Sequence, residues 1–133
     1  MSQRTVGDYM TGSPHSIGKD QPLALAHALM KSHGVRHLPV LDGGALVGMV
    51  SDRDLSLVEA IADVDVHSVL VEEAMSEEVF TVAPEDRLSK VAREMSNRRI
   101  GSAVIMDHGK VVGLFTTVDA LRALAEITEL LAT

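Results

Sequence analysis

A hydroxyl and a carboxylate three residues apart recur at two places in this chain of 133 residues. Ser51 precedes Asp54 in GMVSDRDL, and Thr116 precedes Asp119 in GLFTTVDA. At the start of a helix, such a pair caps backbone N–H groups that have no partner within the helix. The same groups can hold a polar ligand, because a carboxylate accepts hydrogen bonds and a helix N-terminus favours anions. The pattern is therefore either a helix cap or half of a ligand site.

Both motifs belong to an internal repeat with a spacing of 65 residues. Residues 6–54 align with residues 71–119 without a gap, and nine of the aligned pairs are identical. An ungapped register of this length predicts two copies of one structural unit. We place the first copy at residues 1–62 and the second at residues 63–133.

Each copy has the hydrophobic pattern of a strand, a helix, two strands and a second helix. Apolar residues at helical spacing around Met30 and Met95 predict an amphipathic helix in each copy. Asp-Gly-Gly at 42–44 and Asp-His-Gly at 107–109 lie between apolar runs and predict tight hairpin turns. The result is an α+β fold with two pseudo-symmetric strand-helix-strand-strand-helix units, which we expect to pack sheet to sheet because neither has enough core alone.

Glycines occupy matching positions near the ends of the two hairpins. Gly48 and Gly113 lie within apolar strands, where glycine costs stability unless another segment comes close. We expect both to permit close backbone approach rather than to contact a ligand.

Composition excludes several classes of function. A net charge of −7 argues against nucleic-acid binding, which depends on many Lys and Arg side chains at phosphates. Tyr9, Phe80 and Phe115 are the only aromatic residues other than histidine, too few for a groove that stacks single-stranded bases. With no cysteine, the chain can form neither a disulfide nor a thiolate metal site.

Hydropathy indicates where the protein resides. The apolar runs are shorter than the roughly 20 residues that span a bilayer. The first residues, Met-Ser-Gln-Arg, lack the apolar stretch of a signal peptide. We expect a cytoplasmic protein with no membrane partner.

Two long segments, VRHLPVLDGGALVGMVSDRDL and RIGSAVIMDHGKVVGLFTTVDAL, resemble the paired cystathionine-beta-synthase (CBS) domains of a Bateman module. Each is preceded by a helix and by a YM or AM segment, and the resemblance covers residues 3–127. It implies a standalone regulatory module that binds an adenosine-containing nucleotide, of the AMP, ADP or ATP class, in the cleft between the repeats. S-adenosyl or NAD-type ligands are alternatives. A further alternative is a ligand-free module that docks on a partner enzyme or transporter.

The resemblance also implies which residues bind the ligand. The Ser/Thr and Asp of each motif meet the ribose and phosphate, and backbone at the first two strands of each unit meets adenine. Nearby arginines suit the phosphates, since guanidinium groups bind them in a two-pronged manner. The candidate ligand-binding residues are Ser16, Ile17, Val35, Arg36, His37, Ser51, Arg53, Asp54, Thr81, Val82, Arg98, Arg99, Ile100, Thr116 and Asp119.

No catalytic or metal constellation can be placed on these elements. The sequence offers no nucleophile-histidine-acid order, paired carboxylates or phosphate-binding lysine loop, so we expect a protein that is not an enzyme. His33 and His37 lie four apart, but Gly34 between them is expected to end the helix and prevent a preformed metal pair. No cofactor is expected to be required, although Mg²⁺ is a candidate companion of a bound nucleotide.

The final helix has an apolar face that one unit of this size would leave uncovered. Its residues, spaced for one face, are Leu121, Leu124, Ile127 and Leu131. We expect a second copy of the chain to cover them in a homodimer, which regulates a separate protein.

Overall fold

The structure is a computed structural model that describes residues 3–61 and 63–132. The chain forms two compact units, one made of residues 15–79 and the other made of the segments before residue 15 and after residue 79. Each unit has one β-sheet with helices against it, which confirms the α+β class.

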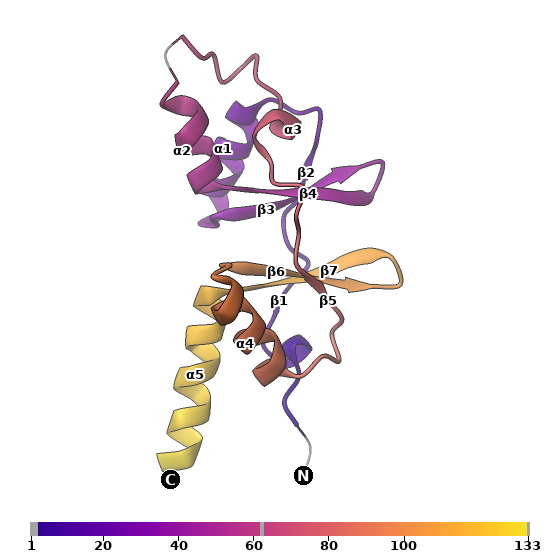
Figure 1. Cartoon of the computed structure of the whole chain (residues 1–133), viewed down its shortest axis with the longest axis vertical. Coiled ribbons are helices and arrows are strands. Elements are labelled where there is room, and N and C mark those ends of the chain that lie inside the picture. Colours follow the sequence, from indigo (N-terminus) through magenta and orange to yellow (C-terminus); the bar gives the residue numbers. More distant parts are fainter. Residues whose placement is uncertain (1–2, 62, 133) are drawn as a thin grey trace. The chain divides into compact units, whose positions relative to one another are not determined.

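The unit of residues 15–79 contains a three-stranded sheet with the order β2-β3-β4. Strand β2 runs parallel to β3, and β3 and β4 form an antiparallel hairpin. Helices α1 and α2 lie on one side of this hairpin in Figure 1. The elements are β2 (Ile17–Gly18), α1 (Leu23–His33), β3 (His37–Asp42), β4 (Ala45–Ser51), α2 (Asp52–Glu59) and α3 (Val71–Ala74).

The other unit repeats this arrangement with one additional strand. Its sheet has the order β1-β7-β6-β5, and α4 and α5 lie on one side of the β6–β7 hairpin in Figure 1. The elements are the 3-10 helix η1 (Val6–Asp8), β1 (Thr11–Gly12), β5 (Thr81–Val82), α4 (Leu88–Arg98), β6 (Ser102–Asp107), β7 (Lys110–Thr116) and α5 (Thr117–Ala132). Every strand, helix and hairpin that the repeat predicts is present, whereas β1 was not predicted.

The leading segment of each repeat packs against the other repeat's elements. The backbone N–H of Val6 donates to the carbonyl of Asp86 at 2.8 Å, and Val6 is wholly buried in the core beside α4. In the other unit, the N–H of Val71 donates to the carbonyl of Gln21 at 2.8 Å, and Val71 is also wholly buried. The compact units therefore differ from the sequence repeats at residues 1–62 and 63–133. Residue 62 itself lies outside the described residues.

Both hairpin turns require a left-handed backbone. Gly43 and Gly44 have φ values of 57° and 87°, and His108 and Gly109 have values of 51° and 76°. A two-residue turn with positive φ at both positions matches the twist of the flanking strands. The turns thus fix the register that brings the end of each hairpin to the start of α2 or α5.

Each unit has its own core between its sheet and its helices. In the unit of residues 15–79, helices α1, α2 and α3 contribute Leu23, Leu55 and Val71, which pack against inward-facing residues of β3 and β4. In the other unit, the wholly buried Phe115 is joined by Val91 and Met95 of α4. These cores hold α2 and α5 against the strands that precede them, so the Ser/Thr–Asp motifs lie at fixed junctions between strand and helix.

Candidate functional site

The Ser51–Asp54 motif forms a complete capping box at the junction of β4 and α2. The Asp54 Oδ2 atom accepts from the Ser51 backbone N–H at 2.8 Å and from the Ser51 hydroxyl at 3.0 Å. In return, the Asp54 N–H donates to Ser51 Oγ at 3.2 Å. Asp54 is half-buried, and its Oδ1 atom has no hydrogen-bond or ion-pair partner among the described residues. The cap thus leaves one carboxylate oxygen free.

Arg36 and His37 flank this motif. His37 pairs with Ser51 across the β3–β4 hairpin, and the Asp52 N–H donates to the Arg36 carbonyl at 2.9 Å. Burial lowers the pKa of the His37 imidazole, while the Asp52 and Asp54 carboxylates act in the opposite direction. The Arg36 side chain is 81% exposed, with its Nε atom 3.9 Å from Asp52 Oδ2. These contacts place charged and polar groups beside the Ser51–Asp54 motif.

The remaining candidates of this unit have different surroundings. Ile17 lies opposite Val40 in the sheet, and its side chain is buried in the core, so it can offer a ligand only backbone. Val35 packs against the same core, whereas Ser16 is exposed. Arg53 is exposed in the first turn of α2 and has no ion-pair partner in the described part of the chain.

The Thr116–Asp119 motif repeats the capping box, but its carboxylate has further partners. Asp119 Oδ2 accepts from the Thr116 N–H at 2.8 Å and from the Thr116 hydroxyl at 3.2 Å. Its Oδ1 atom accepts from the Thr11 hydroxyl at 3.0 Å and from Nη2 of Arg122. Only 3% of Asp119 is exposed. Both oxygens of this carboxylate are already engaged.

Thr11 and Arg122 were absent from the sequence-based candidates. A signal for Arg122 existed, because residues three apart on a helix are neighbours. Thr11 lies 108 residues before Asp119, and no local pattern links them. Its contact depends on the pairing of β1 with β7, which was not predicted.

The other candidates of this unit do not form one cluster, although Arg99 and Ile100 line a surface hollow with Thr117 at the start of α5. Thr81 and Val82 form β5, parallel to β6, and Ile100 packs against the core. The Arg98 Nη1 atom lies 3.8 Å from Glu94 Oε1, and the Arg98 guanidinium carbon lies 5.0 Å from the centre of the Phe80 ring. Arg99 ends α4 with a φ of 55°. Among the described residues, neither arginine makes a hydrogen bond or an ion pair with the Thr116–Asp119 motif.

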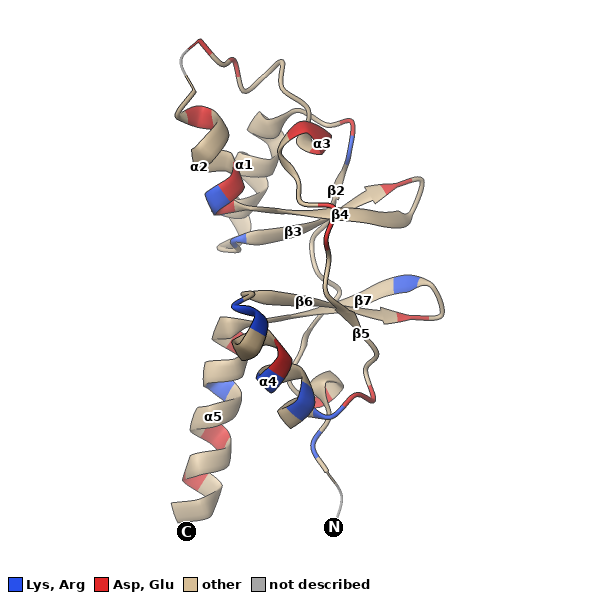
Figure 2. Ribbon diagram, in the orientation of Figure 1, with Lys and Arg blue, Asp and Glu red and all other residues tan. Residues whose placement is uncertain are grey.

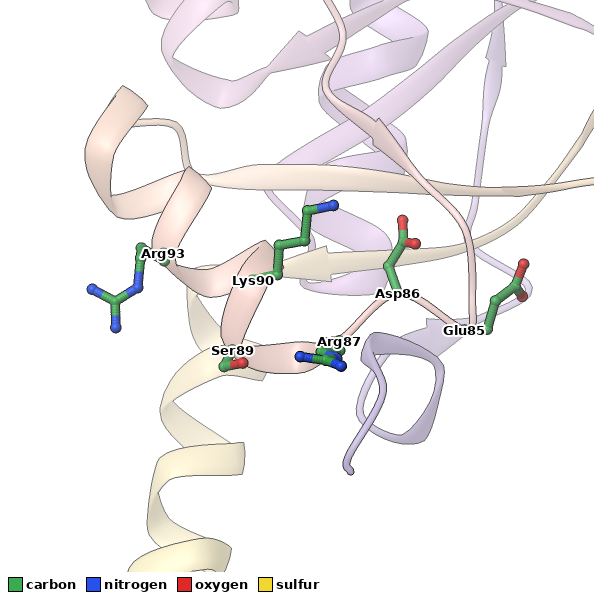
Figure 3. A pocket seen from close by; sticks show the side chains of 6 residues that line it. All are labelled: Glu85, Asp86, Arg87, Ser89, Lys90 and Arg93. Carbon is green, nitrogen blue, oxygen red and sulfur yellow. The ribbon is translucent and has the colours of Figure 1, made fainter. Parts of the chain in front are cut away.

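Basic side chains concentrate on α4, as Figure 2 shows, whereas the first turn of α2 carries two aspartates around one arginine. Six residues line a surface hollow at the start of α4 in Figure 3: Glu85, Asp86, Arg87, Ser89, Lys90 and Arg93. None of them is a predicted ligand residue. Since two carboxylates share this hollow with three cations, its charge is too mixed to select an anion.

The described residues contain no group of three or more His, Asp or Glu side chains that could hold a metal ion. His15 and His33 do approach one another, with stacked rings 3.6 Å apart. Among the helices that the structure describes, none is long and apolar enough to cross a bilayer.

Comparison with known proteins gives two family matches within the chain. The model of the CBS domain matches residues 6–60 and again residues 71–126. A CBS domain-containing protein of Bacillus subtilis, YhcV, is 32% identical over 83% of this chain and 78% of its own length. An inosine-5'-monophosphate dehydrogenase of Korarchaeum cryptofilum is 31% identical, but the match spans 22% of that enzyme and 86% of this chain.

Solved structures match nearly the whole chain. A protein described as a putative acetoin utilization protein, AcuB, from Vibrio cholerae has a TM-score of 0.88 and 29% identity, covering 98% of this chain and 97% of its own. The CBS domain pair of protein MJ0100, in complex with 5'-methylthioadenosine and S-adenosyl-L-methionine, has a TM-score of 0.84 and 25% identity over 94% and 98%. CBSX2 in complex with AMP has a TM-score of 0.77 and 28% identity over 93% and 98%.

Proposed function

The chain belongs to the CBS domain family, with two such domains in tandem, and we propose that it is a regulatory module that binds an adenine nucleotide of the AMP, ADP or ATP class. The proposal needs no chemical step. The dehydrogenase relative matches over only 22% of its own length, so similarity to that enzyme carries no catalytic activity to this chain.

The position of Asp54 is the observation that carries the proposal. Its Oδ2 atom is fixed by Ser51, and its free Oδ1 atom lies beside the first turn of α2. A fixed carboxylate can accept from ribose hydroxyls without losing side-chain freedom on binding. The positive end of the α2 dipole, together with the exposed Arg36 and Arg53 side chains, favours a phosphate. Two structurally similar CBS proteins hold adenosine compounds, which supports the same ligand class here.

Regulation requires that the ligand favour one arrangement of the protein over another, since binding shifts an equilibrium only by its difference in affinity. We propose that a nucleotide at Asp54 changes how the chain associates with a second copy or with a regulated protein. A cytoplasmic location fits this role, and Mg²⁺ would accompany the nucleotide only where it carries two or more phosphates.

A second copy of the chain is the partner that the C-terminal helix favours. Leu121 and Leu124 on α5 are 65% and 57% exposed, and Leu131 is 80% exposed. In a twofold dimer the same surface of each subunit meets itself, so one apolar face supplies both sides of an apolar interface. We therefore propose a homodimer through α5.

A thermal-shift assay tests the nucleotide proposal. We expect AMP, ADP or ATP, at about 100 times its dissociation constant, to stabilise the chain by about 2.7 kcal/mol. The panel includes GTP, S-adenosylmethionine and NADH as matched comparisons. Stabilisation by S-adenosylmethionine or NADH alone would move the assignment to another adenosine ligand. If no compound changed the melting temperature, the docking-module alternative would replace it.

A further inference from the structure

The two aspartates at the helix starts differ in one carboxylate oxygen. Oδ2 is used alike in both, because it accepts from the backbone N–H and hydroxyl of the capping residue. Oδ1 of Asp119 is engaged by Thr11 and Arg122, whereas Oδ1 of Asp54 has no partner among the described residues. The two motifs share the hydroxyl residue and the aspartate three positions later, but only Asp54 has an oxygen that can still accept a hydrogen bond.

The repeat register shows the origin of this difference. Arg122 corresponds to Leu57, which has no hydrogen-bond donor on its side chain. Thr11 corresponds to Ser76, and the Ser76 hydroxyl donates to the carbonyl of Glu78 at 3.4 Å instead. One change of residue type and one change of hydrogen-bond partner therefore leave the first motif open.

The contacts at Asp119 are those of an internal clamp. Thr11 lies on β1, and Arg122 lies one helical turn after Asp119 on α5. The carboxylate thus ties the leading segment of the chain to the last helix of the same unit. A ribose that bound here would first have to displace the Thr11 hydroxyl and the Arg122 guanidinium from a carboxylate that is only 3% exposed, and the loss of these contacts offsets the hydrogen bonds that the ribose gains.

We infer that each chain carries one open nucleotide site, at Asp54, and that Thr11 and Arg122 close the second motif. This inference rests on the proposed function. It assigns Arg122 as the residue that makes the sites unequal and gives Asp119 a structural role. The ligand class is unchanged, but a chain with two equivalent motifs binds a single nucleotide.

Reciprocal variants of the full chain, titrated calorimetrically with AMP, ADP and ATP, test this inference. We expect wild type to bind one nucleotide per chain. Thr11→Val combined with Arg122→Leu frees Asp119 Oδ1, copies Leu57 into the second repeat, and is expected to raise the stoichiometry to two. Arg122→Leu alone is a milder second variant, because the Arg122 side chain is 53% exposed.

The opposite change should close the open site. Leu57 is 63% exposed, so Leu57→Arg places a guanidinium within reach of Asp54 without disturbing the core, and we expect at least tenfold weaker binding. Ile61→Arg adds the same charge at an exposed residue after α2 and is expected to bind within about twofold of wild type.

The outcomes separate the two claims. Two nucleotides on wild type, or unchanged binding by Leu57→Arg, would overturn the inference alone. The same holds if both opening variants keep a native circular dichroism spectrum and still bind one nucleotide. No binding of AMP, ADP or ATP by wild type would overturn the proposed function and this inference with it.

Discussion

Met10 packs against Gly113 so closely that a Cβ atom on this glycine would overlap the Met10 sulfur. The repeat reproduces the contact, because a Cβ on Gly48 would lie 2.8 Å from the Ser76 carbonyl and would also overlap the thioether of Met75. Each glycine thus lets a leading segment lie on a hairpin. The expected close backbone approach is therefore present at both positions.

Gly113→Val should destabilise the chain by roughly 1–3 kcal/mol, because the added side chain must displace Met10 and the backbone of β1. Gly12→Val is the matched control. Gly12 pairs with Gly113 in the sheet, yet a Cβ there meets no atom within 4 Å. We expect the control to change the free energy of unfolding by less than about 0.5 kcal/mol. Equal effects in a urea titration would contradict the packing argument.

The second hairpin turn should tolerate only certain residues at position 108. His108 has a φ of 51°, a conformation that asparagine adopts readily and β-branched residues avoid. We expect His108→Val to cost about 1–2 kcal/mol and His108→Asn to change stability little. Both variants lose the 3.0 Å contact between His108 and Asp107, so their difference isolates the backbone effect. Thermal unfolding measures it, and equal melting temperatures would argue against a left-handed turn.

The half-buried imidazole of His37 should make stability depend on pH. In the unfolded chain it takes up a proton near its ordinary pKa of 6.5, and in the folded chain only at lower pH. Between these two values the unfolded state binds more protons, so the free energy of unfolding is highest above pH 6.5 and falls as the pH decreases. His37→Gln should flatten this part of the profile. A variant whose melting temperature follows the wild-type profile from pH 7.5 to 5 would exclude His37 as the cause.

The apolar face of α5 should hold two chains together. We expect wild type at micromolar concentration to sediment as a dimer of twice the 14.2 kDa chain mass. Leu121→Lys combined with Leu124→Lys should sediment as a monomer, since it places charges in an apolar interface. Glu126→Gln alters an exposed polar residue of the same helix outside this apolar face and serves as the control. A monomeric wild type, or a double variant that stays dimeric, would contradict this interface.

Local sequence patterns predicted most of the fold. The hydrophobic spacing and the turn residues act on neighbouring positions, so both hairpins and the helices around Met30 and Met95 follow from them. The sequence could not show that the leading segment of each repeat packs against the other repeat. Val6 and Val71 are both valine and would suit either core. That choice depends on packing between residues far apart in the sequence.

At the candidate site, contacts between residues close in the sequence could be predicted, and contacts between distant residues could not. Both capping boxes follow from residue types three positions apart. The contacts of long side chains were harder to predict, because such a side chain can reach several partners. Arg98, expected near a ligand phosphate, lies beside Glu94 and Phe80 instead. The state of Asp119 depends on Thr11, which only the tertiary fold brings near.

The central claim is that the Asp54 carboxylate holds the ribose of an adenine nucleotide. Its most direct test is the dissociation constant of AMP, ADP and ATP, measured by calorimetry for wild type, Asp54→Asn, Asp119→Asn and the double variant. Asparagine keeps the size of the side chain but loses the charged acceptor, so we expect Asp54→Asn to weaken binding by about 1.5–3 kcal/mol. Its helix cap should lose only about 0.3–1 kcal/mol of stability, which the melting temperature checks. Asp119→Asn should bind like wild type, and tight binding that survived in Asp54→Asn or in the double variant would contradict the account.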